Sequence, residues 1–403
     1  QTFVVQATHS MTTSSAWSVS GTNSKLVIES GALLTANAAI TLSANTTFQL
    51  DNGATYNHNV TSSAVWGGTE VLDPASTVVY GYAGAQNVAA LSYGNLTING
   101  GGTKSLQGST IVNGVLALTN GNLSLGSGAF NLTLVPGASI SGTFDGNHMV
   151  VCDGTGSLIK QGTSTSDFVM VYPVGTGTSY TPFELTSLSA TVGGTGSIGV
   201  RAVPLIAPGP PSAASTDLKK YWSVSTTGLS AINANLQLTY SNPNEVGLGG
   251  DQTKYIPYYY NTSTSTWSIP VVASGAGVNP MTVSGVTSLT GQWTAREQPI
   301  YTTYYSYQAG PWNMATTWTT DPSGTLSVSP AVPGINDRVV ILNGRTVTTT
   351  ANGYQVLSVQ INEGGTLDLG NFTTQDFTAV RGQGLVRLQN TTFPSGDWSN
   401  FVS

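Results

Sequence analysis

Short hydrophobic pairs separated by turn-forming residues recur along the chain, most clearly in residues 109–144. Two leucines spaced i, i+2 place both side chains on one face of a strand. Asn120, Gly121 and Gly126 lie between such pairs and tolerate the positive φ of tight corners. The pairs follow at intervals of seven and nine residues, without room for a helix: Leu116 and Leu118, Leu123 and Leu125, and Leu132 and Leu134. Strands this short favour a parallel β-helix, a solenoid of stacked coils, over a hairpin meander with its longer strands.

The same spacing predicts a first solenoid over residues 1–160. Residues 17–56 contain four more pairs of this kind, and residues 66–106 continue the pattern at looser intervals. Loose intervals are expected where coils differ in loop length. Leu123 is expected to face the interior of a coil, where an unpaired charge would be costly.

Longer alternating segments predict an immunoglobulin-like β-sandwich over residues 161–298. Stretches such as 180–185, 197–203 and 234–240 are typical of strands whose alternate side chains lie on opposite faces. Turn residues separate them at the intervals expected of a sandwich.

Residues 299–403 are expected to hold an aromatic opening segment, which includes Trp312 and Trp318, and then a second β-helix. Hydrophobic pairs return there, for example Leu367 with Leu369. No polar cap is recognisable near Trp398 that would close an open strand edge. We therefore expect the second solenoid to be incomplete at its C-terminal end, and the chain to be an N-terminal excerpt of a longer protein.

The composition argues against a nucleic-acid-binding protein and a membrane-spanning protein. Charged residues make up 7% of the 403 positions, against roughly 25% in a typical soluble domain. With only 12 Lys and Arg spread along the chain, no basic patch for nucleic acid is recognisable. No apolar run approaches the roughly 20 residues that span a membrane. Cys152 is the single cysteine, so an internal disulfide is excluded. The Thr- and Asn-rich, weakly charged chain is typical of an extracellular protein.

Several segments resemble one family, the giant modular cell-surface adhesins of Bacteroidota. Residues 93–106, YGNLTINGGGTKSL, are similar to its recurring β-helix coil, and residues 172–175 and 220–224, YPVG and KYWSV, are similar to its interspersed β-sandwich modules. Trp312 and Trp318, followed by PGINDRVVI at residues 333–341, resemble the module that opens a new solenoid. The resemblance implies export by the type IX secretion system, a place on the bacterial cell surface, and a role in adhesion or gliding. Its implied partners are surface glycans, other cell-surface proteins and the outer-membrane secretion machinery. The sorting domain that such proteins carry is not present in this sequence.

The acidic residues that could act in catalysis or bind a metal ion are scattered along the sequence, so no enzyme is expected. Polysaccharide-degrading β-helices need clustered carboxylates. Asp145 and Asp153 could align across neighbouring coils, but solvated turn acids are the simpler interpretation. Asp337 is expected to bond local backbone at a turn, with a structural Ca²⁺ site there as a weak alternative. No other cofactor is expected.

Aromatic residues supply the candidate ligand-binding site. Tyr259, Trp267, Trp312 and Trp318 could stack on sugar rings, although aromatics of this kind more often pack in a core. Tyr259 is expected to be the exposed member of its cluster, because Tyr258 and Tyr260 share the opposite face of a strand. Three hypotheses therefore remain: a non-enzymatic structural and adhesive segment of a surface adhesin or filament, a carbohydrate-binding module, and, least favoured, a β-helix polysaccharide-degrading enzyme.

Overall fold

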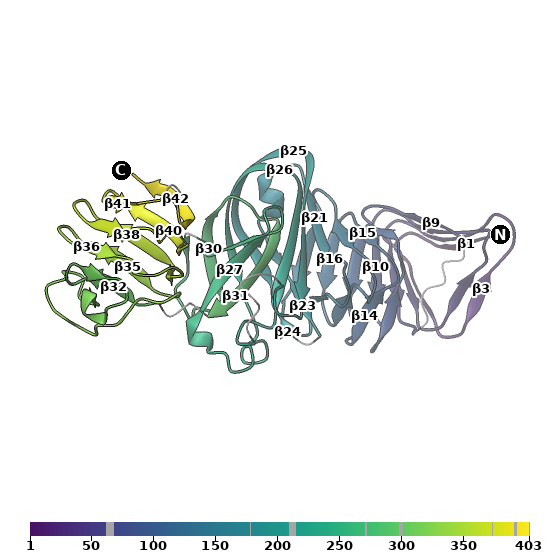
Figure 1. Ribbon diagram of the computed structural model, residues 1–403. Coiled ribbons are helices and arrows are strands. Elements are labelled where there is room, and N and C mark those ends of the chain that lie inside the picture. Colours follow the sequence, from purple (N-terminus) through teal and green to yellow (C-terminus); the bar gives the residue numbers. More distant parts are fainter. Residues whose placement is uncertain are drawn as a thin grey trace. The chain divides into compact units, whose positions relative to one another are not determined.

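The structure is a computed structural model that describes residues 1–61, 68–177, 179–208, 215–270, 272–297, 301–372, 374–390 and 393–402. The chain divides into two compact units, Gln1–Gln298 and Pro299–Ser403. Strands dominate both units, and the helices of the described residues are three single turns of 3-10 helix: η1 (Thr165–Phe168), η2 (Gln252–Lys254) and η3 (Ala315–Thr317). The predicted all-β fold with a parallel solenoid is confirmed (Figure 1).

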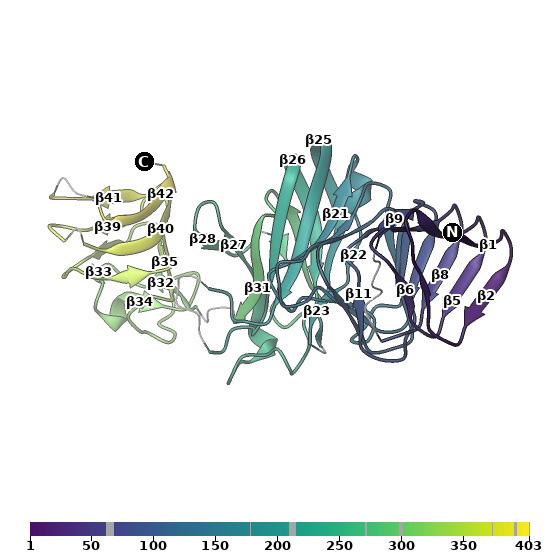
Figure 2. The same cartoon turned by 90° about the vertical axis from the view of Figure 1, so that its right-hand side faces the viewer.

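The first unit begins as a solenoid whose central face is a seven-stranded parallel sheet. Its strands, in spatial order, are β19 (Ser139–Gly142), β16 (Val115–Leu118), β13 (Asn95–Ile98), β10 (Thr77–Tyr80), β8 (Thr55–His58), β5 (Leu33–Ala36) and β2 (Ser10–Thr13). Every neighbouring pair is parallel. Figure 2 shows β2, β5 and β8 lying side by side at the N-terminal end of this sheet.

Two further faces complete the coils. The strands that precede the central one pair as β1 (Thr2–Val5), β4 (Ser24–Ile28), β7 (Thr46–Leu50) and β9 (Thr69–Leu72), and in later coils as β12 (Ser92–Tyr93), β15 (Thr110–Val112), β18 (Leu132–Leu134) and β21 (Leu158–Gly162). Those that follow it pair as β3 (Trp17–Val19) with β6 (Ile40–Leu42), and later as β11 (Gln86–Val88), β14 (Thr103–Leu106), β17 (Asn122–Ser124), β20 (Val150–Val151) and β23 (Val174–Thr176), which β24 (Ser179–Tyr180) extends. Backbone hydrogen bonds between these strands therefore join each coil to its neighbours.

Inward side chains stack in columns from coil to coil. Leu34, Tyr56, Val78, Leu96 and Leu116 are in register on successive strands of the central face, and each is at most 3% exposed. Burying a side chain of this size contributes about 1.5–3 kcal/mol. The i, i+2 pairs of the sequence are the visible trace of these columns.

Coil length varies while the columns are kept. Asn57 Nδ2 donates to Thr35 Oγ1 at 3.2 Å across 22 residues, whereas Asn95 Nδ2 reaches Thr77 Oγ1 at 3.4 Å across 18. The difference is absorbed at corners: residues 51–54 separate β7 from β8, whereas Gly94 alone separates β12 from β13. At another corner, Gly100–Gly102, all three residues have positive φ, from +63° to +79°. A Cβ at Gly100 would lie 2.3 Å from the carbonyl oxygen of Gly81, so only glycine fits the close approach of this corner to the previous coil.

A buried lysine side chain connects this corner to the corresponding corner of the previous coil. Lys104 on β14 is fully buried, and its Nζ donates to the backbone carbonyls of Tyr82, Gly84 and Gly101 at 2.5, 2.7 and 2.7 Å. Burial lowers the pKa of Lys104 to about 8. The next residue of this inward column is Leu123, which is in register with Lys104 and fully buried, as predicted.

The strands beyond residue 162 extend a solenoid sheet. β25 (Phe183–Val203) pairs antiparallel with β21, and β26 (Tyr221–Leu238) follows it along most of its length; both stand as tall strands beside β21 in Figure 1. One end of β26 pairs with β31 (Gly291–Glu297), which continues to β27 (Tyr255–Asn261) and β28 (Thr266–Ser268). Its other end pairs with β30 (Met281–Val286) and through it with β29 (Val272–Ala273), while β22 (Val171–Tyr172) pairs with β25. We call these strands the branched sheet. The expected sandwich of two packed sheets stays a prediction.

The second unit also stacks parallel coils. One sheet has the order β34 (Trp318–Thr319), β32 (Thr303–Ser306), β35 (Arg338–Ile341), β38 (Ser358–Ile361), β40 (Asp376–Gly382) and β37 (Gln355–Val356), with β42 (Ser395–Phe401) on β40. The other has the order β33 (Gly310–Pro311), β36 (Thr346–Thr348), β39 (Thr366–Asp368) and β41 (Leu385–Arg387). Leu367 and Leu369 are fully buried in its core.

Candidate functional site

Two of the expected sugar-binding aromatics lie in a core. Trp312 and Trp318 are fully buried in the second unit, and Trp318 Nε1 donates to the carbonyl oxygen of Trp312 at 2.8 Å. Trp312 stacks on Tyr354 and Phe377, with ring centroids 5.6 and 5.5 Å apart. Their ring faces are thus occupied by neighbouring side chains rather than open to a ligand.

The expected exposure of Tyr259 is wrong. Its side chain is 9% exposed, its ring lies 4.5 Å from that of Trp293, and its hydroxyl donates to the carbonyl oxygen of Thr290 at 2.6 Å. Burial raises the pKa of Tyr259. Tyr259 does lie on the face of β27 opposite Tyr258 and Tyr260, but this face is the core, because Trp293 of the adjacent strand faces the same way.

The partly exposed aromatics are on the opposite face, where Trp267 is one of them. Trp267 on β28 is in register with Tyr260 on β27, and their ring centroids lie 5.0 Å apart. Tyr260 is in register with Gln292 on β31, Gln292 with Ser223 on β26, and Ser223 with Arg201 on β25. Directly paired residues share a face, so these five side chains form one row across five adjacent strands, which we call the cross-strand row.

A second arginine, on the same face of β31 as Gln292, contacts one end of the row. The Arg296 guanidinium lies 5.4 Å from the Trp267 ring centroid and 5.7 Å from that of Tyr258, within the range of a cation–π contact. Arg296 is 7% exposed, and its Nη2 donates to Asp217 Oδ2 at 2.7 Å. Its charge is therefore compensated by Asp217, and its planar group fixes the Trp267 ring in place.

The cross-strand row carries polar groups without partners. Trp267 Nε1, Gln292 Oε1 and Arg201 Nε are buried atoms without a hydrogen-bond partner in the structure. These are two donors and one acceptor on side chains that are otherwise partly exposed. Buried unsatisfied polar groups are rare in folded proteins and call for an explanation. The sequence pointed to Trp267 and to the tyrosines at 258–260, but favoured Tyr259 over Tyr260. It did not indicate Gln292 and Arg201, because only the strand register brings them to the row.

The acidic residues do not converge. Both Asp337 oxygens accept backbone amides: Oδ2 from Gly334 at 2.8 Å, the local turn bond that was expected, and Oδ1 from Thr302, 35 positions away, at 3.0 Å. Asp145 accepts from His148 Nδ1 at 2.7 Å, while Asp153 accepts from the Ser124 hydroxyl. In the part of the chain that the structure describes, no three His, Cys, Asp or Glu side chains form a group that could hold a metal ion.

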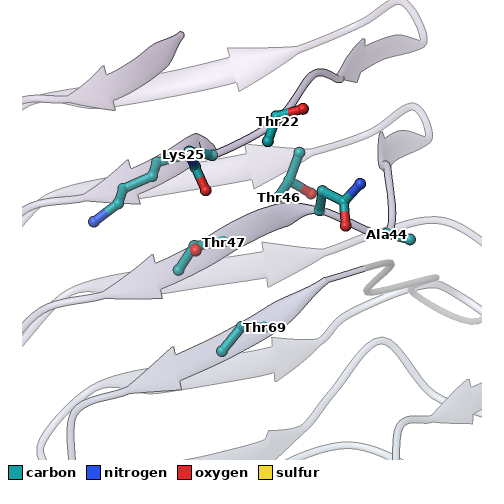
Figure 3. A pocket seen from close by; sticks show the side chains of 8 residues that line it. Thr22, Lys25, Ala44, Thr46, Thr47 and Thr69 are labelled. Atoms are coloured by element: carbon teal, nitrogen blue, oxygen red, sulfur yellow. The ribbon is translucent and has the colours of Figure 1, made fainter.

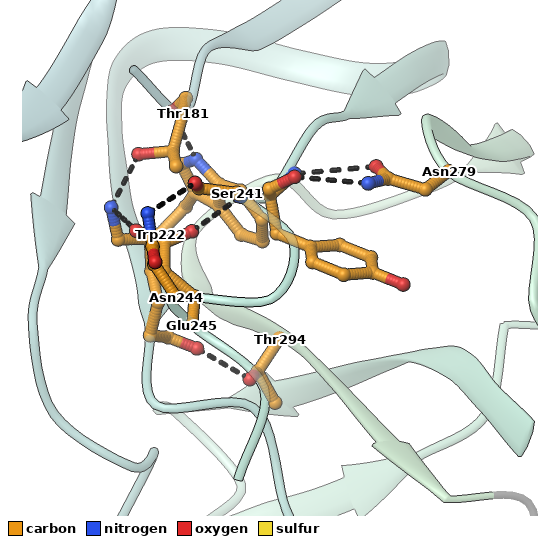
Figure 4. Close-up of polar contacts among 9 residues, drawn as sticks. Thr181, Trp222, Ser241, Asn244, Glu245, Asn279 and Thr294 are labelled. Carbon is orange, nitrogen blue, oxygen red and sulfur yellow. Dashed lines mark hydrogen bonds and ion pairs between the residues drawn. The ribbon is translucent and has the colours of Figure 1, made fainter. Parts of the chain in front are cut away.

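A buried ion pair joins segments that flank the strands of the branched sheet (Figure 4). Lys220 Nζ contacts Glu245 Oε1 and donates to Thr181 Oγ1 at 2.6 Å. Glu245 Oε2 accepts from the Ser241 amide at 2.8 Å, and Trp222 Nε1 donates to the Thr181 carbonyl at 2.8 Å. Burial lowers the pKa of Lys220 and raises that of Glu245. Both side chains are enclosed, so this network anchors the 241–245 turn to β26 rather than facing a ligand.

A shallow depression lies on the early coils (Figure 3). It is lined by hydroxyl and amide side chains and one lysine: Thr22, Asn23, Lys25, Ala44, Asn45, Thr46, Thr47 and Thr69. The ammonium group of Lys25 points away from Thr22 and Ala44. The described residues that line it include no carboxylate, so they supply no acid–base pair for hydrolysis.

No family model, curated protein or solved structure matches the chain. Function therefore has to be argued from the solenoid and from the cross-strand row. Within the described ranges, no helix has the length and apolar character needed to cross a membrane.

Proposed function

We propose that the chain is a non-enzymatic structural and adhesive segment of a bacterial cell-surface adhesin or filament. The observation that carries the proposal is the construction of the solenoid. Its coils are joined by a continuous seven-stranded parallel ladder on the central face and by uncharged side-chain bonds on the outside, such as Asn59 Nδ2 to Asn37 Oδ1 at 3.0 Å. Backbone and side-chain bonds in the same direction give a stiff rod in which each coil supports its neighbours.

The chemistry of the surface supports a place outside the cell. Ser, Thr and Asn take the outward positions that charged residues occupy in most soluble domains. The resemblance of residues 93–106 and 220–224 to Bacteroidota adhesins supports the finer proposal of export by the type IX secretion system. It also supports surface glycans or neighbouring surface proteins as partners.

Antibody labelling of intact cells tests this proposal. Antibodies raised against residues 1–298 should label the bacterium that encodes the chain before its membranes are permeabilised. The label should disappear from the surface when type IX secretion is disabled. Labelling that appears only after permeabilisation would overturn the surface assignment, and surface labelling that persists without type IX secretion would overturn the export route alone.

A further inference from the structure

The cross-strand row combines three features that a saccharide site needs. The partly exposed Tyr260 and Trp267 offer apolar ring surface, on which the C–H face of a pyranose stacks. Gln292 and Ser223 offer amide and hydroxyl groups at the centre of the row. Arg201 offers a guanidinium at the other end. Few, well-placed polar groups beside aromatic surface are typical of small-ligand sites.

The dimensions of the row favour a chain rather than a single sugar. Its five strands, β25, β26, β31, β27 and β28, are consecutive neighbours in one sheet. Four gaps between strands at about 4.8 Å each give a length of roughly 19 Å. This span fits an oligosaccharide that lies across the strands, with one end over the aromatic pair and the other at Arg201.

The charge of the row favours an acidic ligand. Arg296 already pairs with Asp217, whereas Arg201 has no ion-pair partner among the described residues. A guanidinium binds a carboxylate with two parallel hydrogen bonds. The chain as a whole carries a net charge of −6, so it has no general attraction for polyanions, and binding of an acidic polymer must come from a local site.

We propose that the outer face of the branched sheet binds a carboxylate-bearing oligosaccharide along the cross-strand row. A uronic acid carboxylate pairs with Arg201, and a neighbouring sugar ring stacks on Tyr260 and Trp267. Rotation of the Gln292 side chain presents its unpartnered Oε1 atom to a sugar hydroxyl, while Trp267 stays in place as part of the stacking surface. The inference names a partner class for the adhesive part of the proposed function and rests on it only for its biological setting.

Calorimetric titration of the full chain with defined oligosaccharides tests the proposal. The probes are oligomers of galacturonate, glucuronate and mannuronate, each with its neutral methyl ester, and dextran sulfate as a general polyanion. At least one uronate oligomer should bind, its methyl ester should bind more weakly, and dextran sulfate should not compete. Arg201→Gln and Tyr260→Ala should each weaken binding at least about tenfold, the loss expected for one charge-assisted or stacking contact.

Matched controls separate a lost contact from a lost fold. Arg387→Gln removes an exposed arginine from β41 of the second unit and should leave the affinity unchanged. Thermal unfolding of Arg201→Gln should match that of the wild type, because the Arg201 Nε bonds nothing in the fold. The proposal fails if no uronate oligomer binds at millimolar concentration, or if Arg201→Gln and Tyr260→Ala bind as the wild type does. Surface labelling of intact cells is independent of this result, so the two proposals can fail separately.

Discussion

Lys104 provides the sharpest test of how the solenoid is held together. The substitution Lys104→Met keeps an unbranched apolar stem in the same space but removes the ammonium. It leaves the carbonyls of Gly84 and Gly101 without the donor that they share, whereas the Tyr82 carbonyl keeps its bond from the Gly84 amide at 2.8 Å. An unsatisfied buried polar group costs about 1–3 kcal/mol, so the middle of this range gives about 4 kcal/mol for two carbonyls. Removal of a buried charge offsets part of that cost, and the expected loss in unfolding free energy is about 2 kcal/mol.

Two other lysines make a graded series with the same substitution. Lys160 on β21 is also buried, but its Nζ donates to one carbonyl, that of Val135, at 2.9 Å. Lys25 on β4 is exposed. Urea unfolding followed by circular dichroism should therefore rank the losses as Lys104→Met, then Lys160→Met, with Lys25→Met within about 0.5 kcal/mol of wild type.

Hydrogen exchange adds a local readout for the same variants. Amides between residues 82 and 106 should lose protection in Lys104→Met, because the three carbonyls belong to two successive corners. If Lys104→Met is as stable as wild type and this segment stays protected, the carbonyls have found other partners and the reasoning is refuted.

The remaining predictions concern charge and catalysis. Leu116→Asp should cost more than about 4 kcal/mol, because it places an unpaired carboxylate in an apolar column; Val115→Asp, on the outer face of the same strand, should cost little, and similar melting temperatures for the two would show that the register is wrong. Leu123→Asp is a weaker test, since Lys104 lies in register with it. Between pH 8 and about 10.5, the wild type should gain stability relative to Lys104→Met, because unfolded Lys104 still holds a proton that the folded state has released; an unchanged difference across that range would contradict the lowered pKa. No polysaccharide on a neutral and acidic depolymerase panel should be cleaved, and metal-dependent cleavage of any of them would refute the non-enzymatic assignment.

The solenoid could be predicted from sequence because its rules are local. A buried residue, an outward residue and another buried residue make a strand of one coil, and the corner residues follow directly. Leu116 and Leu118 reveal this arrangement without knowledge of any distant contact. Coil closure then follows from the need to cover each apolar column with the next coil.

The candidate site could not be predicted, because it depends on contacts between distant segments. Alternation places Tyr259 and Tyr260 on opposite faces, but it does not say which face is the core. Trp293, more than thirty positions away in the sequence, decides this by packing on Tyr259. Arg201 joins the row only through the register of β25, β26 and β31, and such registers are set by the whole sheet rather than by any short motif.

The variable corners have a consequence for how such a protein evolves. Because coils of 18 and 22 residues keep the same columns, an insertion or deletion at a corner changes a surface loop without shifting the buried residues. Duplication of one coil lengthens the rod by about 4.8 Å. The new coil packs the same inward side chains against the coil before it and the coil after it. Solenoid length and loop sequence can therefore vary independently between lineages, while the buried positions of every new coil need nearly the same side chains.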